Sequence, residues 1–507
     1  DWRDEIYKTG LIQTYNLNIS GGSESTKVFM SFGYFKDSGT TLGSDFSRAT
    51  NKINVSHKIN NFLKAGINSQ LSYSKTNAPP SGSGGANPVR SAEVINAASP
   101  VYDGAGNYEW GNKAIFDFNP VGLAALDKYT YKTKRAVMST YLDVDISPSF
   151  KFRTTAGIDT SLDEGLNYYN PDHGNGAGVN GRSTASRSDL LSWNISNILT
   201  YSRSTDQSYF EVLLGQEALG TDYSVLSAAV TDFSVPGKPD LIWGAKPEQP
   251  GSFTTSSTMV SYLSQIKYDY DKRIYLSTSA RMDGSSRFGT NNKYGLFYSF
   301  GAGWQLSKES WMPEWSWLNN AKLRASYGTS GNNNIGNYAS LGLYGSGANY
   351  GGYPGLTPIQ LENKDLSWEK IQSFNIGLEL NFFSKLQTSF EFYNRNSDGL
   401  LFARPLSAGT GIGSILSNLG AMKNRGIEAS FKYNLIDNDK FYSALGLNIS
   451  TNSNEILQLT TDKIVSGTKL LEEGSSIYQF YMREWAGVNP DNGRPMWFVN
   501  ADADDKE

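Results

Sequence analysis

The stretch "FNIGLELNFFSKLQTSFEFYNRN", Phe374–Asn396, alternates apolar and polar residues on both sides of a short turn. Successive side chains of a β-strand point to opposite faces, so a period of two gives each strand two faces of different character. The apolar positions are Phe374, Ile376, Leu378, Leu380, Phe382, Leu386, Phe390 and Phe392. The polar positions between them include Asn375, Glu379, Asn381, Gln387, Ser389 and Glu391. The stretch therefore predicts a β-hairpin with one apolar face and one polar face.

The same alternation recurs along the whole chain and predicts about sixteen strands. Their expected spans are 12–20, 27–36, 46–58, 62–76, 134–146, 150–163, 188–203, 208–224, 256–270, 273–283, 293–306, 320–329, 369–382, 386–398, 424–435 and 440–455. The fold class is therefore all-β.

The joins between these strands are of two kinds. Every second join is short and rich in Asn, Asp, Gly, Pro and Ser, as tight reverse turns require, apart from a longer one at 307–319 that resembles a helical turn. The remaining joins are mostly long, at 77–133, 164–187, 225–255, 330–368 and 399–423. Such segregation predicts an up-and-down antiparallel meander, because a sandwich with Greek-key crossings would mix the two kinds.

Composition limits the function. The net charge is −4, from 45 basic and 49 acidic residues, which gives no electrostatic basis for binding nucleic acid. The absence of Cys excludes disulfides and thiolate metal sites, and no apolar run is long enough for a transmembrane helix. The chain opens on "DWRDEIYKTG" without a signal peptide and ends abruptly on "NADADDKE", so we expect it to be an internal part of a longer protein.

The two faces of the predicted sheet need different surroundings. Charges such as Asp143, Lys151 and Arg153 would be costly in a dry core, and a continuous apolar face would promote aggregation in water. Both difficulties disappear in a transmembrane β-barrel with lipid outside and water or a plug inside. The alternative is a large soluble β protein.

The barrel interpretation assigns each face and each end of the sheet. Short turns are expected in the periplasm and long loops outside the cell. Residues expected to face lipid are Leu142, Val144, Ile376, Leu378, Leu380, Phe390, Phe392, Ala429 and Phe431. Residues expected to face the lumen are Asp143, Lys151, Arg153, Glu379, Glu391, Glu428 and Lys432. Aromatic residues near strand ends that suit interfacial girdles are Tyr34, Trp193, Tyr268, Tyr270, Trp304 and Tyr433.

Five blocks of sequence resemble SusC/RagA-type TonB-dependent outer-membrane transporters of Bacteroidetes. They are "DWRDEIYKTGLIQTYNLNISGGSESTKVFMSFGYFKDSG" at the start, "RMDGSSRFG" (Arg281–Gly289), "LSWEKIQSFNIGLEL" (Leu366–Leu380), "LSNLGAMKNRGIEASFKYNL" (Leu416–Leu435) and "EWAGVNPDNGRPMW" (Glu484–Trp497). The blocks span nearly the whole chain and stand in family order, which makes them more specific together than singly.

The resemblance implies an outer-membrane barrel of about 22 strands, closed by an N-terminal plug and energised by TonB. It also implies a SusD-like surface lipoprotein as partner. Residues 1–507 would then be a partial barrel domain with about sixteen strands, and a further one around 476–486, without the plug, the TonB box and the last strands. The implied function is import of oligosaccharides or peptides. The alternatives are a siderophore or vitamin receptor, or a structural barrel that anchors a surface lipoprotein or an export assembly.

Aromatic residues in the long loops are the candidate contacts for a substrate or a lid. Tyr and Trp stand among Gly, Asn and Pro at 102–112, 241–251 and 344–356, and aromatic faces suit both sugar rings and protein interfaces. The alternative is that they pack the loops onto one another or onto a lid. The candidates are Tyr108, Trp110, Trp243, Tyr350 and Tyr353.

Catalytic, metal and cofactor sites are not expected. His57 and His173 lie far apart without a neighbouring His or Cys, and "DHGNGAGVNG" (Asp172–Gly181) lacks the Gly-Lys-Ser/Thr of a phosphate loop, so we expect a flexible surface loop there. Asp143 and Asp145 share a strand face, but no nucleophile accompanies them. "NADADDKE" resembles a calcium loop only in its carboxylates, and a solvated loop is the preferred interpretation.

Overall fold

The computed structural model describes residues 1–79, 86–110, 118–313, 315–461 and 463–498. All sixteen strands predicted from the alternation are present, so the all-β prediction is confirmed. They are β1 (Leu11–Gly22), β2 (Thr26–Ser38), β3 (Asp45–Lys58), β4 (Leu63–Ala78), β5 (Lys128–Asp145), β6 (Phe150–Tyr169), β7 (Arg182–Ser204), β8 (Ser208–Phe233), β10 (Gly251–Tyr270), β11 (Ile274–Ser285), β12 (Tyr294–Gln305), β13 (Leu318–Asn332), β16 (Glu369–Phe382), β17 (Leu386–Pro405), β18 (Ser414–Asn438) and β19 (Phe441–Gln458).

The remaining elements are short. The further strands are β9 (Gly244–Pro247), β14 (Leu343–Tyr350), β15 (Tyr353–Gln360), β20 (Lys463–Ser466), β21 (Lys469–Glu472), β22 (Trp485–Val488) and β23 (Pro495–Trp497). The helices are α1 (Trp2–Ile6), α2 (Pro88–Val94), α3 (Pro120–Leu126) and α4 (Gly174–Ala177), with 3₁₀ turns η2 (Leu241–Trp243), η3 (Leu306–Lys308) and η4 (Ala408–Thr410). The 3₁₀ turn η3 stands where the sequence indicated a helical turn between β12 and β13.

Consecutive strands pair in antiparallel register, as the meander predicts. The chain divides into unit 1, formed by 1–201 and 215–260, and unit 2, formed by 202–214 and 261–507. In unit 1, β1 to β7 pair in chain order. In unit 2, β11, β12, β13 and β16 to β19 do the same.

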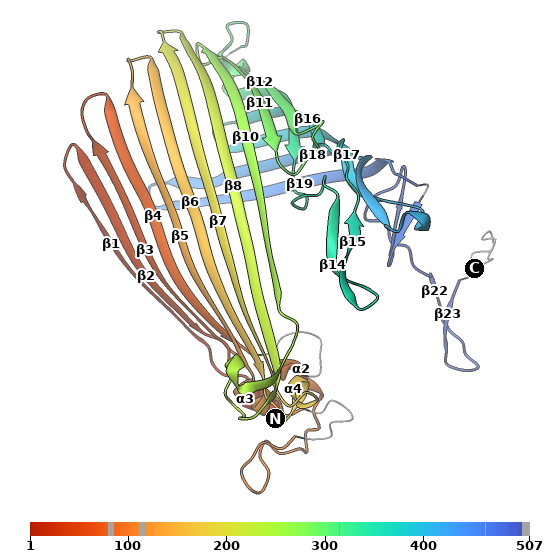
Figure 1. Cartoon of the computed structure of the whole chain (residues 1–507). Helices are drawn as coiled ribbons and strands as arrows, with labels where there is room; N and C mark the ends of the chain where they lie inside the picture. Colours follow the sequence, from red (N-terminus) through yellow and green to blue (C-terminus); the bar gives the residue numbers. More distant parts are fainter. Residues whose placement is uncertain (80–85, 111–117, 314, 462, 499–507) are drawn as a thin grey trace. The chain divides into compact units, whose positions relative to one another are not determined.

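The two kinds of join lie at opposite ends of the strands. Figure 1 shows α2, α3, α4 and the N-terminus at one end of β1–β8 and the tight turns at the other. We call these the loop end and the turn end. Two of the tight turns have the central residues Asp271-Lys272 and Phe383-Ser384, and all four of these residues have φ between 51° and 56°. This left-handed pair is the geometry of a type I′ turn, which matches the right-handed twist of the strands it joins.

Several strands extend beyond their predicted spans at the loop end. β6 continues to Tyr169, β8 to Phe233, and β17 to Pro405, where it still pairs with β18. Backbone hydrogen bonds hold these extensions. The extensions of β6 and β8 lie partly within the loop layer, where Tyr168 and Phe233 are buried, and side-chain polarity does not alternate regularly there.

The two faces separate as predicted. On the charged face, Arg153 pairs with Asp143, and Arg324 approaches Glu379 at 3.1 Å (Nε–Oε1). On the apolar face, the rings of Phe390 and Phe431 meet edge to face with centroids 5.5 Å apart. In unit 1, the register places Leu142 beside Ala65 and Thr154 on the apolar face of that unit.

The apolar face is exposed. Along β12, Leu296 and Phe300 are 61% and 56% exposed, whereas Phe297, which points to the charged face, is 7% exposed. Exposed apolar surface on this scale is unfavourable in water but suits a hydrocarbon environment. Of the predicted girdle, Tyr34, Trp304 and Tyr433 are exposed near strand ends, while Trp193 lies near the middle of β7 against Gly220.

Buried cores occur at the loop end, where helices cover one another. Trp2 and Ile6 of α1 pack with Ala92 of α2 and Val121 of α3. Both α2 and α3 begin with Asn-Pro-Val, and the side chains of Asn87 and Asn119 each accept two backbone N–H groups of the first turn. This cap satisfies amides that a helix N-terminus leaves unpaired, and proline at the first position suits the helical φ.

The strand expected around 476–486 is not part of the main sheet. Residues 476–479 form a turn, Phe480 makes one isolated bridge to Lys469, and β22 pairs only with β23 among the described residues. No helix in the described ranges is long and apolar enough to span a membrane. The "NADADDKE" segment lies outside the described residues, so its expected loop structure stays a prediction.

Candidate functional site at the loop end

In unit 1, the loop end is a packed layer whose centre is His173. His173 is fully buried and stacks on Trp110, with ring centroids 3.4 Å apart. Trp110 in turn covers Gly122 of α3, where an added Cβ would lie 2.2 Å from the indole. The expectation of a surface loop at 172–181 therefore holds only in part, because His173 and Gly176 are buried whereas Asp172, Asn175 and 178–180 are exposed. Gly and Asn are abundant there because the backbone makes close contacts, as where Gly176 lies against the Asn170 carbonyl.

A polar chain ties His173 to the start of β5. The Asn170 amide Nδ2 donates to Asp127 Oδ1 at 2.6 Å and lies 2.6 Å from His173 Nε2, so His173 accepts through Nε2. The Asn170 backbone N–H also donates to Asp127 Oδ1, at 2.9 Å. Burial raises the pKa of Asp127 to about 6, despite these two donors. Its second oxygen, Oδ2, has no hydrogen-bond partner among the described residues, which is consistent with a carboxyl that is readily protonated.

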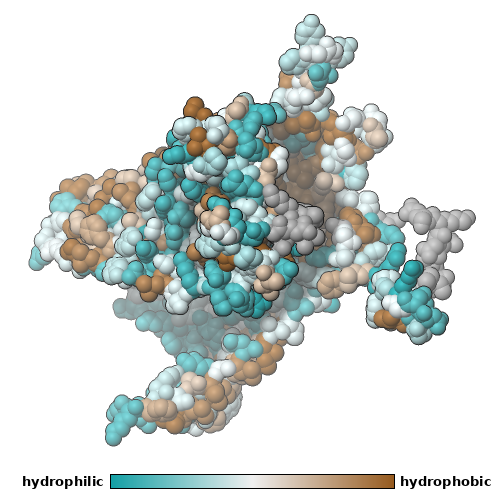
Figure 2. Space-filling model, turned by 90° about the horizontal axis from the view of Figure 1, so that it is seen from below, coloured by the Kyte–Doolittle hydropathy of each residue, from teal (hydrophilic) through white to brown (hydrophobic). Residues whose placement is uncertain are grey.

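The five candidate aromatic residues fall into two groups. Tyr108 packs against the core formed by Trp2, Ile6 and their neighbours, and Trp110 lies under the His173 ring. Both therefore hold the loop layer together in this structure. Trp243, in η2, is exposed. Figure 2, a view of the loop end of unit 1, shows mainly hydrophilic and pale surface in the middle of the picture.

In unit 2, three of the family-like blocks converge in one hub at the loop end. Phe288, from the block Arg281–Gly289, and Leu366, from the block Leu366–Leu380, are fully buried. Trp368 lies between Phe288 and Phe297, with centroid distances of 4.7 and 5.5 Å. Gly289 allows this approach, because a Cβ there would lie 2.0 Å from the Lys364 carbonyl oxygen.

Half-buried polar side chains fix the loops to this hub. Asn418, from the block Leu416–Leu435, accepts from the Ser367 N–H at 2.8 Å and donates to the carbonyls of Ser367 and Gly399. Glu369 accepts from the Leu401 N–H at 2.9 Å and from Asn332 Nδ2 at 2.7 Å. One residue thus links the start of β16 to β13 and β17. The blocks that stand far apart in sequence therefore build one rigid support.

The hairpin β14–β15 projects from this support. Tyr350 and Tyr353 pair at its tip and are 88% and 76% exposed. Tyr344, Leu356 and Ile359 on the same hairpin are also exposed. The structure thus places these two candidates, like Trp243, where a partner or ligand can reach them. No comparison tests a contact role for any of the five, so that role stays a prediction.

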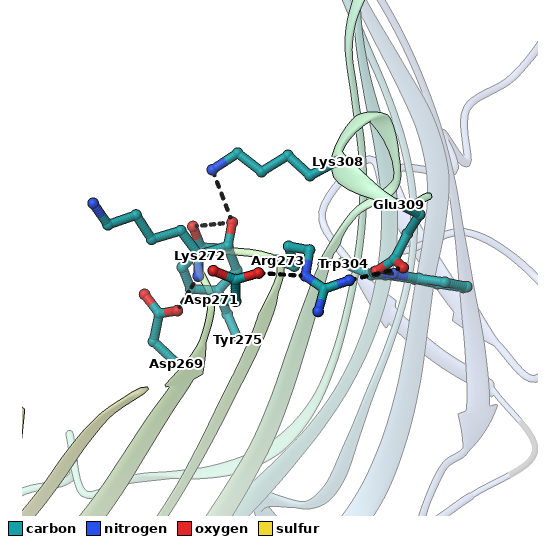
Figure 3. A network of polar contacts seen from close by, with 8 residues as sticks. All are labelled: Asp269, Asp271, Lys272, Arg273, Tyr275, Trp304, Lys308 and Glu309. Atoms are coloured by element: carbon teal, nitrogen blue, oxygen red, sulfur yellow. Dashed lines mark hydrogen bonds and ion pairs between the residues drawn. The ribbon is translucent and has the colours of Figure 1, made fainter. Parts of the chain in front are cut away.

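At the turn end of unit 2, a polar network fixes the connection between β12 and β13 (Figure 3). Glu309 accepts from Trp304 Nε1 at 2.9 Å and from Arg273 Nη1 at 3.3 Å. The carbonyl of Lys272 accepts from Tyr275 Oη and Lys308 Nζ, at 3.0 and 3.3 Å. The bond between Arg273 and Glu309 is charge-assisted, and such bonds are stronger than those between neutral groups. The carboxylate of Glu309 thereby ties the connection between β12 and β13 to Trp304 of β12 and to Arg273 in the turn between β10 and β11.

The described residues contain no group of three or more His, Cys, Asp or Glu that could hold a metal ion. His57 instead bonds the Thr26 hydroxyl across the β2–β3 pair, with Oγ1 and Nδ1 2.7 Å apart. Asp143 forms an ion pair with Arg153, and Asp145 forms one with Lys151, as expected for the polar wall of a barrel.

Comparison with known proteins gives consistent relatives. "TonB-dependent receptor P39" of Formosa agariphila is 30% identical over 497 residues, which cover 96% of this chain and 47% of the relative. "TonB-dependent receptor SusC" of Bacteroides thetaiotaomicron is 27% identical, with 98% and 53% covered. The chain therefore spans about half the length of the curated relatives it matches.

Solved structures share the fold. The structure described as the RagAB peptide transporter matches 99% of this chain and 58% of its own, with a TM-score of 0.86 and 25% identity. The siderophore receptor PiuA from Acinetobacter baumannii matches with a TM-score of 0.55 at 12% identity, which shows the fold alone. The family model described as "TonB dependent receptor-like, beta-barrel" matches residues 3–470. The resemblance to SusC/RagA-type receptors is thus confirmed, and the chain belongs to the TonB-dependent receptor-like β-barrel family.

Proposed function

We propose that this chain is the membrane-spanning barrel part of an outer-membrane nutrient importer that works with a SusD-like surface lipoprotein. The observation that carries the proposal is the combination of an exposed apolar face with a rigidly supported, aromatic loop end. The apolar face suits lipid, and the exposed hairpin β14–β15 suits a large partner protein. The imported nutrient would be an oligosaccharide or a peptide, and the outer membrane would be its location.

Energy for import would come from TonB and the proton gradient, acting on parts of the protein other than residues 1–507. A wide barrel without a plug would be a passive pore, so a movable plug and an energy source belong together. In the polar wall, among the residues that the structure describes, the paired carboxylates Asp143 and Asp145 are engaged by the basic side chains of Arg153 and Lys151. We therefore propose a transporter and not an enzyme.

Two other functions remain as alternatives. A siderophore or vitamin receptor shares the fold, but the siderophore receptor PiuA and the ferric citrate transporter FecA are only 12% and 11% identical to this chain. A structural barrel that anchors a surface lipoprotein or an export assembly would use the same loop end without passing a substrate. The likeness to the structure described as the RagAB peptide transporter, at higher identity and TM-score, favours the importer.

The test is uptake and copurification with the intact protein. Purification in mild detergent should recover a surface lipoprotein in near-stoichiometric amount, and removing residues 343–360 should weaken that recovery. Whole cells should take up labelled oligosaccharide or peptide mixtures only while TonB is present and the proton gradient is maintained. Uptake that continues after both are removed would indicate a passive pore. A stable assembly without any uptake would favour the structural alternative.

A further inference from the structure

The apolar face of unit 1 carries a row of tyrosines near the loop end. Tyr15 pairs with Tyr34, Tyr34 with Ala49, and Ala49 with Tyr73, so these residues lie side by side across β1–β4. All three tyrosines are exposed. Tyrosine side chains concentrate where hydrocarbon meets lipid headgroups. The row therefore marks that level on this face of the sheet.

Lysines stand immediately beyond the tyrosines on the same face. Two residues further toward the loop end, β2 presents Lys36 and β4 presents Lys75, and Lys75 pairs directly with Lys132 of β5. Lysines directly opposite each other on neighbouring strands repel and destabilise the pair. A bound anion between them would remove this repulsion.

The acidic side chains nearest the lysines on this face are Glu164, which stands directly opposite Lys132 in the register, and Asp45, and both contact other residues. Glu164 Oε2 pairs with Lys134 Nζ at 3.2 Å, and Asp189 pairs with Arg187 at 3.1 Å. Asp45 accepts from the Asn77 amide at 2.9 Å. By contrast, Lys36, Lys75 and Lys132 make no ion pair with any residue that the structure describes. Their charges are therefore available to an external anion.

An open apolar groove begins directly below the lysines. Its volume is about 910 Å³, and its lining includes the tyrosine row. Ala49 and Asn51 form its floor because they are small, while Leu17 and Phe32 rise on one side and Leu71 and Tyr73 on the other. A hydrocarbon chain fits such a groove. Figure 1 shows that β1–β4 run side by side over this length.

We propose that Lys36, Lys75 and Lys132, with the groove beneath them, bind a lipid of the surrounding leaflet whose phosphate headgroup carries a net negative charge. The lysine ammonium groups would contact the phosphate, and one acyl chain would lie between Leu17 and Leu71. The inference rests on the proposed function, because it requires the apolar face to meet a bilayer. It assigns a specific lipid site to a face that plays no part in substrate passage.

The test measures lipid retention by the full-length transporter with native mass spectrometry. The protein in mild detergent is mixed with dioleoyl phosphatidic acid, dioleoyl phosphatidylcholine or inorganic phosphate. Phosphatidic acid should be retained preferentially, and the K75Q/K132Q double variant should bind it about tenfold more weakly, with wild-type affinity falling as salt rises. K52Q is the matched control, since Lys52 lies on the charged face of β3, and it should bind as the wild type does.

A second variant tests the groove separately from the charges. A49W places a large ring on the groove floor and should reduce binding of dioleoyl phosphatidic acid more than binding of its dihexanoyl form. Equal binding of phosphatidylcholine, stronger binding of inorganic phosphate than of the lipid, or unchanged binding by K75Q/K132Q would overturn the lipid site. Failure of the wild type to insert into lipid nanodiscs would instead refute the membrane location, on which the lipid site depends.

Discussion

Arg324 on β13 reaches Glu391 on β17 by crossing the strand that lies between them. Its Nη2 donates to Glu391 Oε2 at 2.6 Å, and its Nε lies 3.1 Å from Glu379 on β16. The residue beneath the guanidinium is Gly377, which pairs with Arg324 on one side and Glu391 on the other. An added Cβ at Gly377 would lie 2.8 Å from Arg324 Nε. The glycine thus provides the space for a three-strand ion network.

This relationship predicts coupled effects of mutation. Arg324→Gln and Gly377→Ala should each lower the free energy of unfolding by about 1 kcal/mol, a modest figure because the charges are partly exposed. In the Arg324→Gln background, Gly377→Ala should be nearly neutral, because the displaced guanidinium is gone. Urea unfolding in lipid vesicles measures all three variants. Additive losses would contradict the assignment of space at Gly377 to Arg324.

The alternation that reveals the strands also predicted which residues share a face. Leu378 and Glu379 separated as expected because a strand has no other way to place neighbouring side chains. The network at Gly377 was not predictable in the same way. It requires the register of three strands, and Arg324 stands 53 positions before Gly377 in the numbering, with a long loop between them.

The loop layer was the least predictable part. Its Gly and Asn residues resemble a flexible loop, yet His173 is buried there because glycines let the backbone pack closely around it. One signal was available: Asn-Pro-Val occurs at 87–89 and again at 119–121, and Asn before Pro is a strong helix start. Reading that repeat would have predicted α2 and α3, although not the stacking of Trp110 on His173.

The lipid-facing assignment of the apolar face gives a direct prediction. Leu378→Lys should destabilise the barrel by about 2–4 kcal/mol if it reaches the bilayer midplane, because a charge there loses its hydration. Asn375→Lys, three residues away on the charged face, is the matched control and should change stability by less than about 1 kcal/mol. Thermal unfolding of the full-length protein in nanodiscs compares them. A larger loss for Asn375→Lys would reverse the two faces.

Orientation can be measured by cysteine labelling, since the chain has no native cysteine. Tyr350→Cys at the tip of β14–β15 should react with a membrane-impermeant maleimide on intact cells. Asp439→Cys, in the turn between β18 and β19, should react only after the outer membrane is opened. Long loops outside and short turns in the periplasm are the rule for such barrels. Labelling of Asp439→Cys alone on intact cells would invert the proposed orientation.

The buried carboxyl of Asp127 makes the unit 1 loop layer sensitive to pH. Burial raises its pKa from 3.8 to about 6 in the folded layer, so the folded state holds the proton more tightly than the unfolded state. The layer is therefore most stable at low pH and loses stability as pH rises from about 4 to about 6, by about 2–3 kcal/mol in total. Above that range, no further change from this group is expected.

Hydrogen exchange of the segments 119–127 and 170–177 tests this dependence. After correction for intrinsic exchange rates, protection should be greater at pH 5 than at pH 7.5, because Asp127 must be buried as an anion at the higher pH. Asp127→Asn should remove the difference, since an amide oxygen still accepts from Asn170 but carries no titrating proton. Asp103→Asn is the control, because that exposed carboxylate has its pKa lowered by hydrogen bonds from Asn107 and neighbouring amides. Asp103→Asn should leave the trend intact. A pH difference that persists unchanged in Asp127→Asn would assign the effect to another group of the layer.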